Sequence, residues 1–152
     1  MEYTHISLLD HPKNEQGVFE HLIKKYKEFG TLYIGVDFDN TLYPHEFSDD
    51  ESKFPKGFNS ILELLQRAKH HGLKLCLWTL PKTKENLDWK IQWCRDHGIE
   101  VDYINESPLM NEYSKIFGKP HFNLLLDDVA GLESSYSILY NIIQYIEEQN
   151  KK

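Results

Sequence analysis

Apolar residues in this chain follow two kinds of spacing that alternate along its length. Spacing of three or four positions, typical of helices buried along one side, occurs in residues 15–29, 57–70, 83–96 and 133–148. Short apolar runs, typical of buried strands, occur at residues 32–37, 73–79 and 122–126, and an alternating run at 99–104 predicts an edge strand. Helices that alternate with strands predict an α/β fold, a Rossmann-like, mostly parallel sheet with helices on both faces.

The length of 152 residues suits one domain with a full hydrophobic core. The helix predicted over residues 15–29 ends at Gly30, where a left-handed helix cap is expected. Nothing after this glycine has the composition of a linker or of a second domain. We therefore expect residues 1–30 to form an N-terminal helical extension packed on the core, and residues 31–152 to form the main domain.

Composition and charge exclude some classes of function. The content of 40 % apolar and 27 % charged residues is ordinary for a soluble globular protein. The formal charge of −7 argues weakly against a general nucleic-acid-binding surface, and the basic side of the first helix, with Lys24, Lys25 and Lys27, is expected to be solvated. No apolar run approaches the length of a membrane span, and the first residues lack the pattern of a secretion signal, so we expect no membrane contact.

The two cysteines, Cys76 and Cys94, occur in an apolar run and on the apolar side of a predicted helix. Buried thiols of this kind usually act as small apolar side chains. We expect both to be reduced rather than to form a disulfide or a metal pair, and we expect the cytoplasm as the compartment.

Polar residues follow three of the predicted strands at their carboxyl ends. Asp37 and Asp39 end the first strand, Thr79 ends the second, and Asp127 and Asp128 end the last. A desolvated carboxylate is costly without a partner, so paired acids at the end of a buried strand indicate a bound cation or a reaction. Parallel strands place their carboxyl ends at one edge of the sheet, where α/β folds hold their sites. The sequence predicts that these groups converge.

The order of these groups resembles the haloacid dehalogenase superfamily of phosphohydrolases, in a small form without a cap domain. The resemblance covers about residues 31–132 and includes four motifs, which correspond here to Asp37-Phe38-Asp39-Asn40-Thr41, Thr79, Lys119 and Asp127-Asp128. Lys115 is an alternative to Lys119 for the third motif. Asn40 stands where many members have glycine, and Val129 where related small phosphatases often have Arg or Lys.

The resemblance implies a role for each acidic residue of the first motif. Asp37 would attack phosphorus and form an aspartyl-phosphate, and Asp39 would act as general acid and then as general base. Contacts to the phosphate would come from Phe38, Asp39, Thr79 and Lys119. The resemblance thus implies a phosphomonoester hydrolase, with residues 31–152 as its catalytic domain.

The resemblance also implies a Mg²⁺ ion as cofactor. Its ligands would be Asp37, the backbone carbonyl of Asp39, and Asp127, with Asp128 binding directly or through water. These are hard oxygen ligands, which Mg²⁺ prefers. Which of the two acids of the last motif is the direct ligand stays open.

The spacing between motifs has room for no cap domain. About thirty residues separate Thr41 from the second strand, and a helix takes half of them. An open site suits a phosphorylated small molecule, enclosed by homo-oligomerisation, or a phosphorylated polymer end; nucleic acid is expected only as a substrate.

Two other classes of protein share some of these features. A catalytically silent module of the same fold would keep the motifs for binding or regulation. A receiver-like phospho-acceptor domain uses similar groups, but its acidic pair follows the first strand and its phosphorylated aspartate comes later, the reverse of the order here. Within the first class, phosphotransfer to an acceptor other than water remains an alternative to hydrolysis.

Overall fold

The computed structural model describes residues 10–44, 50–112 and 121–152. Its helices and strands follow one another as α1 (Glu15–Phe29), β1 (Tyr33–Asp37), the 3₁₀ helix η1 (Glu51–Lys53), α2 (Lys56–His70), β2 (Lys74–Trp78), α3 (Lys84–Asp96), β3 (Tyr103–Ile104), β4 (Leu124–Leu126) and α5 (Leu132–Asn150). The four predicted helices lie within two residues of their expected bounds.

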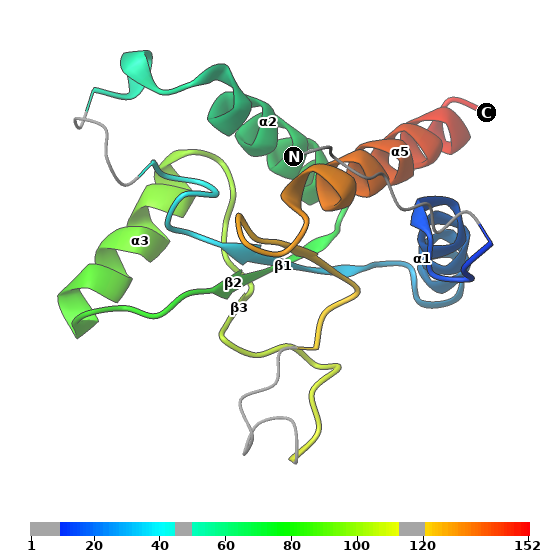
Figure 1. Cartoon of the computed structure of the whole chain (residues 1–152), viewed down its shortest axis with the longest axis horizontal. Coiled ribbons are helices and arrows are strands. Elements are labelled where there is room, and N and C mark those ends of the chain that lie inside the picture. The colour runs from blue at the N-terminus through cyan, green and yellow to red at the C-terminus, as the bar shows by residue number, and fades with distance from the viewer. Residues whose placement is uncertain (1–9, 45–49, 113–120) are drawn as a thin grey trace, which may run out of the picture.

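The four strands form one sheet in the order β3-β2-β1-β4, and every neighbouring pair is parallel. Figure 1 shows the sheet with α2 and α5 on the same side of it, and α3 near the exit of β2. This flanked parallel sheet confirms the predicted Rossmann-like α/β fold. Because all strands run the same way, their carboxyl ends share one edge.

The hydrophobic core lies between the sheet and the helices α2 and α5. Alternate residues of the strands belong to a single apolar cluster with residues of both helices: Ile34, Val36, Leu75, Leu77, Leu124 and Leu126 from the strands, and Ile61, Leu65, Leu139, Ile142 and Ile143 from the helices. Burial of one such side chain contributes about 1.5–3 kcal/mol. The core therefore holds β1 and β4 firmly in register.

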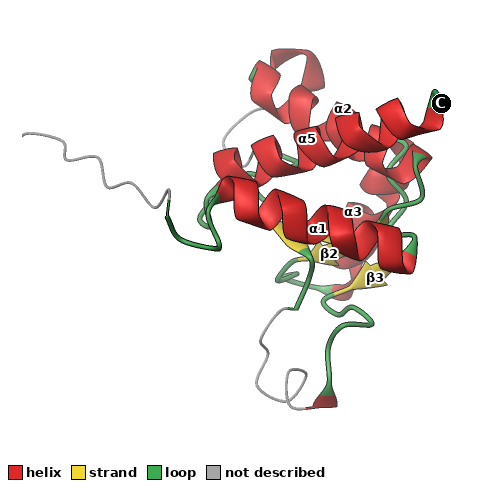
Figure 2. Cartoon of the chain, turned by 90° about the vertical axis from the view of Figure 1, so that its right-hand side faces the viewer, coloured by secondary structure: helices red, strands yellow, loops and turns green. Residues whose placement is uncertain are grey.

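Helix α1 packs against α5, so the first part of the chain shares the core of the rest (Figure 2). The Asn14 side chain accepts a hydrogen bond from the Gly17 N–H and caps the start of the helix. At the other end Gly30 has a φ of 77°, the left-handed cap that the sequence predicts. Between these caps, Leu22 and Ile23 are buried in the common core.

The strand predicted over residues 99–104 is shorter than expected and is formed only by Tyr103 and Ile104. Just before it, the Asp102 N–H donates to the Leu75 carbonyl, and the Asp102 carboxylate accepts the Leu75 N–H at 2.8 Å. The Asp102 carboxylate thus accepts the N–H group that a backbone carbonyl would accept if β3 were longer. As predicted, β3 lies at an edge of the sheet.

The opposite edge strand begins in the same way. The Asn123 N–H donates to the Tyr33 carbonyl, and the Asn123 side-chain oxygen accepts the Tyr33 N–H at 2.7 Å. Consequently β4 starts at Leu124 rather than at residue 122. Both edge strands are therefore entered through a polar side chain that pairs with the neighbouring strand.

The two cysteines are free and buried, as predicted for reduced thiols. Burial raises the pKa of each thiol to about 12, so the reactive thiolate form is scarce at neutral pH. Within the described ranges, no helix is both long enough and apolar enough to cross a membrane.

Gly35 offers a test of the packing of Phe122 against the sheet. This residue is buried in the middle of β1, and a Cβ atom added there would overlap the ring of Phe122. We expect Gly35→Ala to destabilise the fold by about 1–3 kcal/mol in urea unfolding, because the ring must move. Gly57→Ala in α2, where an added Cβ meets nothing within 4 Å, is the control and should be neutral or stabilising. Equal stability of the two variants would contradict the close approach of Phe122.

Candidate active site

The exit of β1 is a tight loop that fixes the first motif. The Phe38 carbonyl accepts hydrogen bonds from the N–H groups of Thr41, Leu42 and Tyr43. This loop needs a residue with positive φ, and Asn40 takes it at 61°. Asparagine tolerates the left-handed region better than most residues, so Asn40 can take this conformation at little cost.

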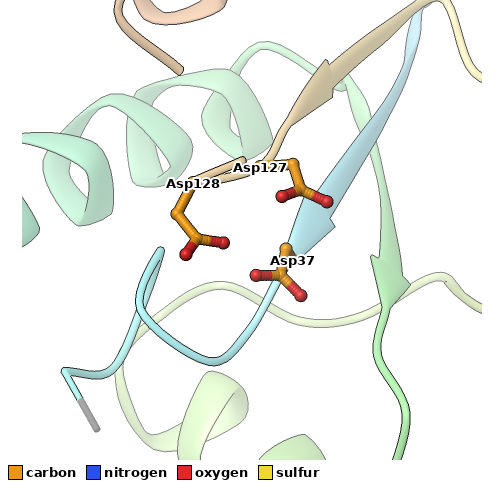
Figure 3. Close-up of side chains that lie close together, drawn as sticks. All are labelled: Asp37, Asp127 and Asp128. Atoms are coloured by element: carbon orange, nitrogen blue, oxygen red, sulfur yellow. The ribbon is translucent and has the colours of Figure 1, made fainter. Parts of the chain in front are cut away.

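Three carboxylates from two strand ends converge at the carboxyl edge of the sheet. Asp37 ends β1, and Asp127 and Asp128 follow β4. The register pairs Val36 with Leu126, so the segments after these two strands leave the sheet side by side. Figure 3 shows the three side chains gathered at this edge, and one carboxylate oxygen of each lies within 4.8 Å of those of the other two. The sequence prediction that these acids converge is thereby met for the described residues.

Thr41 joins the two strand ends. Its side chain is fully buried, with 0 % exposure. Its hydroxyl donates to the Asp37 carboxylate at 3.3 Å and accepts the backbone N–H of Asp128 at 3.0 Å. One hydroxyl group therefore sets the position of Asp37 relative to the acidic pair after β4.

The cluster shifts the ionisation of Asp37. Burial is the largest cause; a hydrogen bond shared with Asp128 and the charges of Asp127 and Asp128 also contribute, and together they raise the pKa of Asp37 to about 7. The hydrogen bond from Thr41 acts in the opposite direction but is weaker. Among the described residues, no Lys, Arg or His forms an ion pair with these three carboxylates.

The donor set and its charge fit a divalent cation. Three carboxylates supply hard oxygen atoms within one small volume. A cation would relieve the repulsion among them, which adds to the effect of burial on the pKa of Asp37. Asp127 also accepts the Val129 N–H at 3.0 Å, which fixes its side chain. These residues therefore fit the Mg²⁺ ion that the sequence resemblance implies.

Lys90 is a member of the site that the sequence reasoning did not identify. It lies in α3 with a side-chain exposure of 3 %, and its ammonium group donates to the Asp39 carboxylate and to the Thr79 hydroxyl, each at 2.9 Å. The ammonium also lies 5.3 Å from the centroid of the Phe38 ring. One buried lysine thus connects the exits of β1 and β2.

A signal for Lys90 was present in the spacing of α3. Leu87 and Cys94 belong to the apolar spacing of the helix predicted over residues 83–96, and Lys90 falls three positions after Leu87 and four positions before Cys94. A lysine inside an apolar helical stripe is rarely buried without a partner. The pattern therefore called for an acidic or hydroxyl partner, which the fold supplies as Asp39 and Thr79.

Thr79 is positioned by a second asparagine. The Asn105 side-chain oxygen accepts the Thr79 N–H at 2.8 Å, and the Asn105 N–H donates to the Leu77 carbonyl. Asn105 has a φ of 53°, and with Asn40 it is one of two non-glycine residues in the left-handed region among those described. Strained backbone of this kind is common at functional sites.

Two of the predicted phosphate contacts, Phe38 and Lys119, are not seen as exposed side chains at the described site. The Phe38 side chain is fully buried, so only its backbone could contact a phosphate. Lys119 and its alternative Lys115 lie outside the described residues. Asp37, Asp39, Thr79, Asp127 and Asp128 all lie at the exits of neighbouring strands.

No family model matches the chain, and no curated protein matches it. One solved structure, described as a conserved protein from Bacteroides thetaiotaomicron, is similar to it, with 26 % sequence identity and a TM-score of 0.54. The similarity covers 76 % of this chain and 91 % of the other chain. It agrees with the α/β fold described above.

The acidic cluster predicts an unusual effect of Asp37→Asn on stability. A carboxyl group whose pKa is raised in the folded state favours folding below its ordinary pKa, and this contribution is lost as the pH rises from about 4 to about 7. In chelator at pH 8, we therefore expect Asp37→Asn to raise the free energy of unfolding by roughly 1–2 kcal/mol, because it removes one charge from the cluster. The measurement is urea unfolding of the wild type and the variant at pH 8 and at pH 5. The difference between their free energies of unfolding should be smaller at pH 5.

Asp88→Asn is the matched control, because Asp88 is an exposed residue of α3. It should change stability little at either pH. A stability for Asp37→Asn at or below that of the wild type at pH 8 would show that the three carboxylates do not repel one another as the geometry requires.

Proposed function

We propose that this protein is a Mg²⁺-dependent phosphomonoester hydrolase of the haloacid dehalogenase type. The main support for this proposal is the convergence of Asp37, Asp127 and Asp128 within 4.8 Å at the carboxyl edge of a parallel sheet. Beside it, the first-motif Asp39 accepts a hydrogen bond from Lys90, which also donates to the Thr79 hydroxyl. An acidic cation-binding cluster next to an oriented carboxylate and hydroxyl is suited to phosphoryl transfer.

Asp37 is the nucleophile in this proposal. A carboxylate oxygen of Asp37 attacks phosphorus and forms an aspartyl-phosphate, while the bond from phosphorus to the ester oxygen breaks. The departing oxygen takes a proton from Asp39. Asp39 then takes a proton from a water molecule, which attacks phosphorus, releases inorganic phosphate and restores Asp37.

Lys90 and Thr79 orient the reacting groups. Lys90 donates to one oxygen of Asp39 and fixes the direction of that carboxylate. The Thr79 oxygen accepts from Lys90, so the hydroxyl proton is directed elsewhere and can be donated to a phosphoryl oxygen. Neither group needs to move during the reaction, which suits electrostatic stabilisation by preorganised donors.

Asp37, Asp127, Asp128 and the backbone carbonyl of Asp39 would hold the Mg²⁺ ion. When bound, the ion supplies positive charge that offsets the carboxylates and the phosphate. The chain itself contributes the hydrogen bond of Thr41, which keeps Asp37 beside the acidic pair with or without the ion.

The proposal includes an open site in a reducing compartment. Apart from the sheet strands β2 and β4, the described segments between the motifs contain only η1, α2, α3 and β3, and none of these forms a cap domain. Phosphorylated small molecules and phosphorylated polymer ends, nucleic acid among them, are therefore the substrate classes, and a homo-oligomer could enclose a small one. The two free, buried thiols suit the cytoplasm.

Hydrolysis of p-nitrophenyl phosphate tests the proposed chemistry. We expect turnover with Mg²⁺ and its loss in chelator, and we expect Asp37→Asn to lower kcat by at least about 10⁴-fold, because Asn cannot form the aspartyl-phosphate. Asp88→Asn, on the exposed side of α3, should retain activity. Full activity in Asp37→Asn would remove Asp37 from the nucleophile role; binding of Mg²⁺ without turnover of any phosphomonoester would favour a silent regulatory module.

Lys90→Met tests the orienting role of the buried lysine. Methionine preserves most of the apolar volume of the side chain but removes both hydrogen bonds, so we expect kcat to fall about 10²- to 10³-fold and the pH–rate profile to change shape. Lys84→Met, at the exposed start of α3, is the control. A Lys90→Met enzyme with an unchanged kcat and pH–rate profile would assign Lys90 to packing alone.

A further inference from the structure

A cavity of about 650 Å³ lies at the other end of β1 from the acidic cluster. Its walls come from α1, from the start of β1, and from residues 108–109 and 121–123. Figure 2 shows α1 in front of the sheet, with the loop after β3 running below it. The volume is in the range of pockets that bind small molecules.

The cavity is separate from the candidate active site. Tyr33, the first residue of β1, lines the cavity, and Asp37, the last residue, belongs to the acidic cluster. Four steps along an extended strand span about 13 Å. None of the five site residues that follow the strands lines the cavity.

The charged and titratable lining of the cavity is basic. Lys13, His21, Lys25 and His121 line it, and no aspartate or glutamate is among its described lining residues. None of these four basic side chains forms an ion pair within residues 10–44, 50–112 and 121–152. In a chain of net charge −7, this is a local excess of positive charge.

The ionisation of His21 responds to that charge. Burial lowers the pKa of His21 below its ordinary value, and the nearby charges of Lys13, Lys25 and Lys24 lower it further. The contributions of the lysines show that their positive charges act on this part of the cavity, where an anion would be attracted. Lys25 was expected to be merely solvated, but it is half-buried at this wall.

The rest of the lining is apolar and aromatic. Phe29, Phe122 and Leu109 contribute to it. Phe29 is 64 % exposed, which is a high value for so large an apolar side chain. The Lys25 ammonium lies 5.4 Å from the centroid of the Phe29 ring, so a charge and a ring face stand side by side. Phe122 is held in place by its close approach to Gly35 and by Trp78.

We propose that this cavity binds a small organic anion, a molecule with an aromatic or hydrocarbon body and a phosphate, sulfonate or carboxylate head. The head lies against Lys13, Lys25 and the two histidines, and the body lies against Phe29 and Phe122. Charge-assisted hydrogen bonds to the head and burial of the body both contribute to binding. The site is independent of the proposed hydrolase activity.

Naphthalene-1-sulfonate is a suitable probe, because it carries an aromatic body and a sulfonate that a phosphatase cannot hydrolyse. The measurement is a titration of the full chain followed by ¹H–¹³C spectra of the histidine rings, assigned with single His→Gln variants. We expect saturable shifts of the His21 and His121 signals. The rings of His70, His71 and His97, which do not line the cavity, serve as internal controls and should not shift.

Two comparisons decide which part of the probe is recognised. A neutral analogue, 1-naphthalenemethanol, and inorganic sulfate should each bind at least about tenfold more weakly, because each lacks one half of the recognised structure. Equal binding of the neutral analogue would overturn the anion assignment, and equal binding of sulfate would overturn the apolar one.

Lysine variants test the location of the site. Lys13→Met with Lys25→Met should raise the Kd about tenfold. Lys27→Met is the control, since Lys27 belongs to the same helix as Lys25 but lies over the Tyr145 ring of α5. An unchanged Kd in the double variant, or shifts of the control histidines equal to those of His21 and His121, would overturn the proposal; the histidine shifts of the wild type decide the matter even if the double variant does not fold.

Discussion

Repulsion among three carboxylates at one edge of the sheet is the constraint around which the site is organised. Parallel strands bring their carboxyl ends together, so Asp37 and the acidic pair after β4 must share a small volume. The burial of both strands in the hydrophobic core offsets the free energy of this repulsion. The hydrogen bonds of Thr41 fix the spacing of the acids. Burial, a hydrogen bond shared with Asp128 and the neighbouring negative charges together raise the pKa of Asp37. The stability of the core therefore holds together a group of negative charges that a divalent cation would largely offset.

Two buried polar side chains divide the work of arranging this edge. Thr41 connects β1 to the segment after β4, and Lys90 connects the exit of β1 to the exit of β2. Both are almost completely buried, and both have their hydrogen-bonding groups satisfied. A buried polar group with fixed partners has few alternative positions. The nucleophile candidate and the acid–base candidate are consequently positioned by separate contacts, so that loss of one need not displace the other.

The sequence predicted the fold and the acidic part of the site, because both depend on patterns that are local in the chain. Helical spacing and strand runs gave the α/β class, and acids at strand ends gave Asp37, Asp127 and Asp128. Lys90 could not be assigned in the same way, since its partners depend on how α3 is rotated against two strands that are distant in sequence. The early ends of the predicted edge strands were missed for a related reason: Asp102 and Asn123 pair with their neighbours through side chains, and residue pattern alone does not show such pairing.

The two ends of β1 carry potentials of opposite sign, and this bears on how a phosphorylated ligand would approach. The acidic edge repels a phosphate until a cation is bound, while the basic lining around Lys13 and Lys25 attracts anions at all times. In the proposed reaction, an anionic substrate would meet less repulsion at the acidic edge once a divalent cation offsets two of the three carboxylate charges there. Lys90 alone cannot do this, because its ammonium group is already engaged by Asp39 and Thr79. Binding of the cation before the substrate is thus the order that the charges of this site favour.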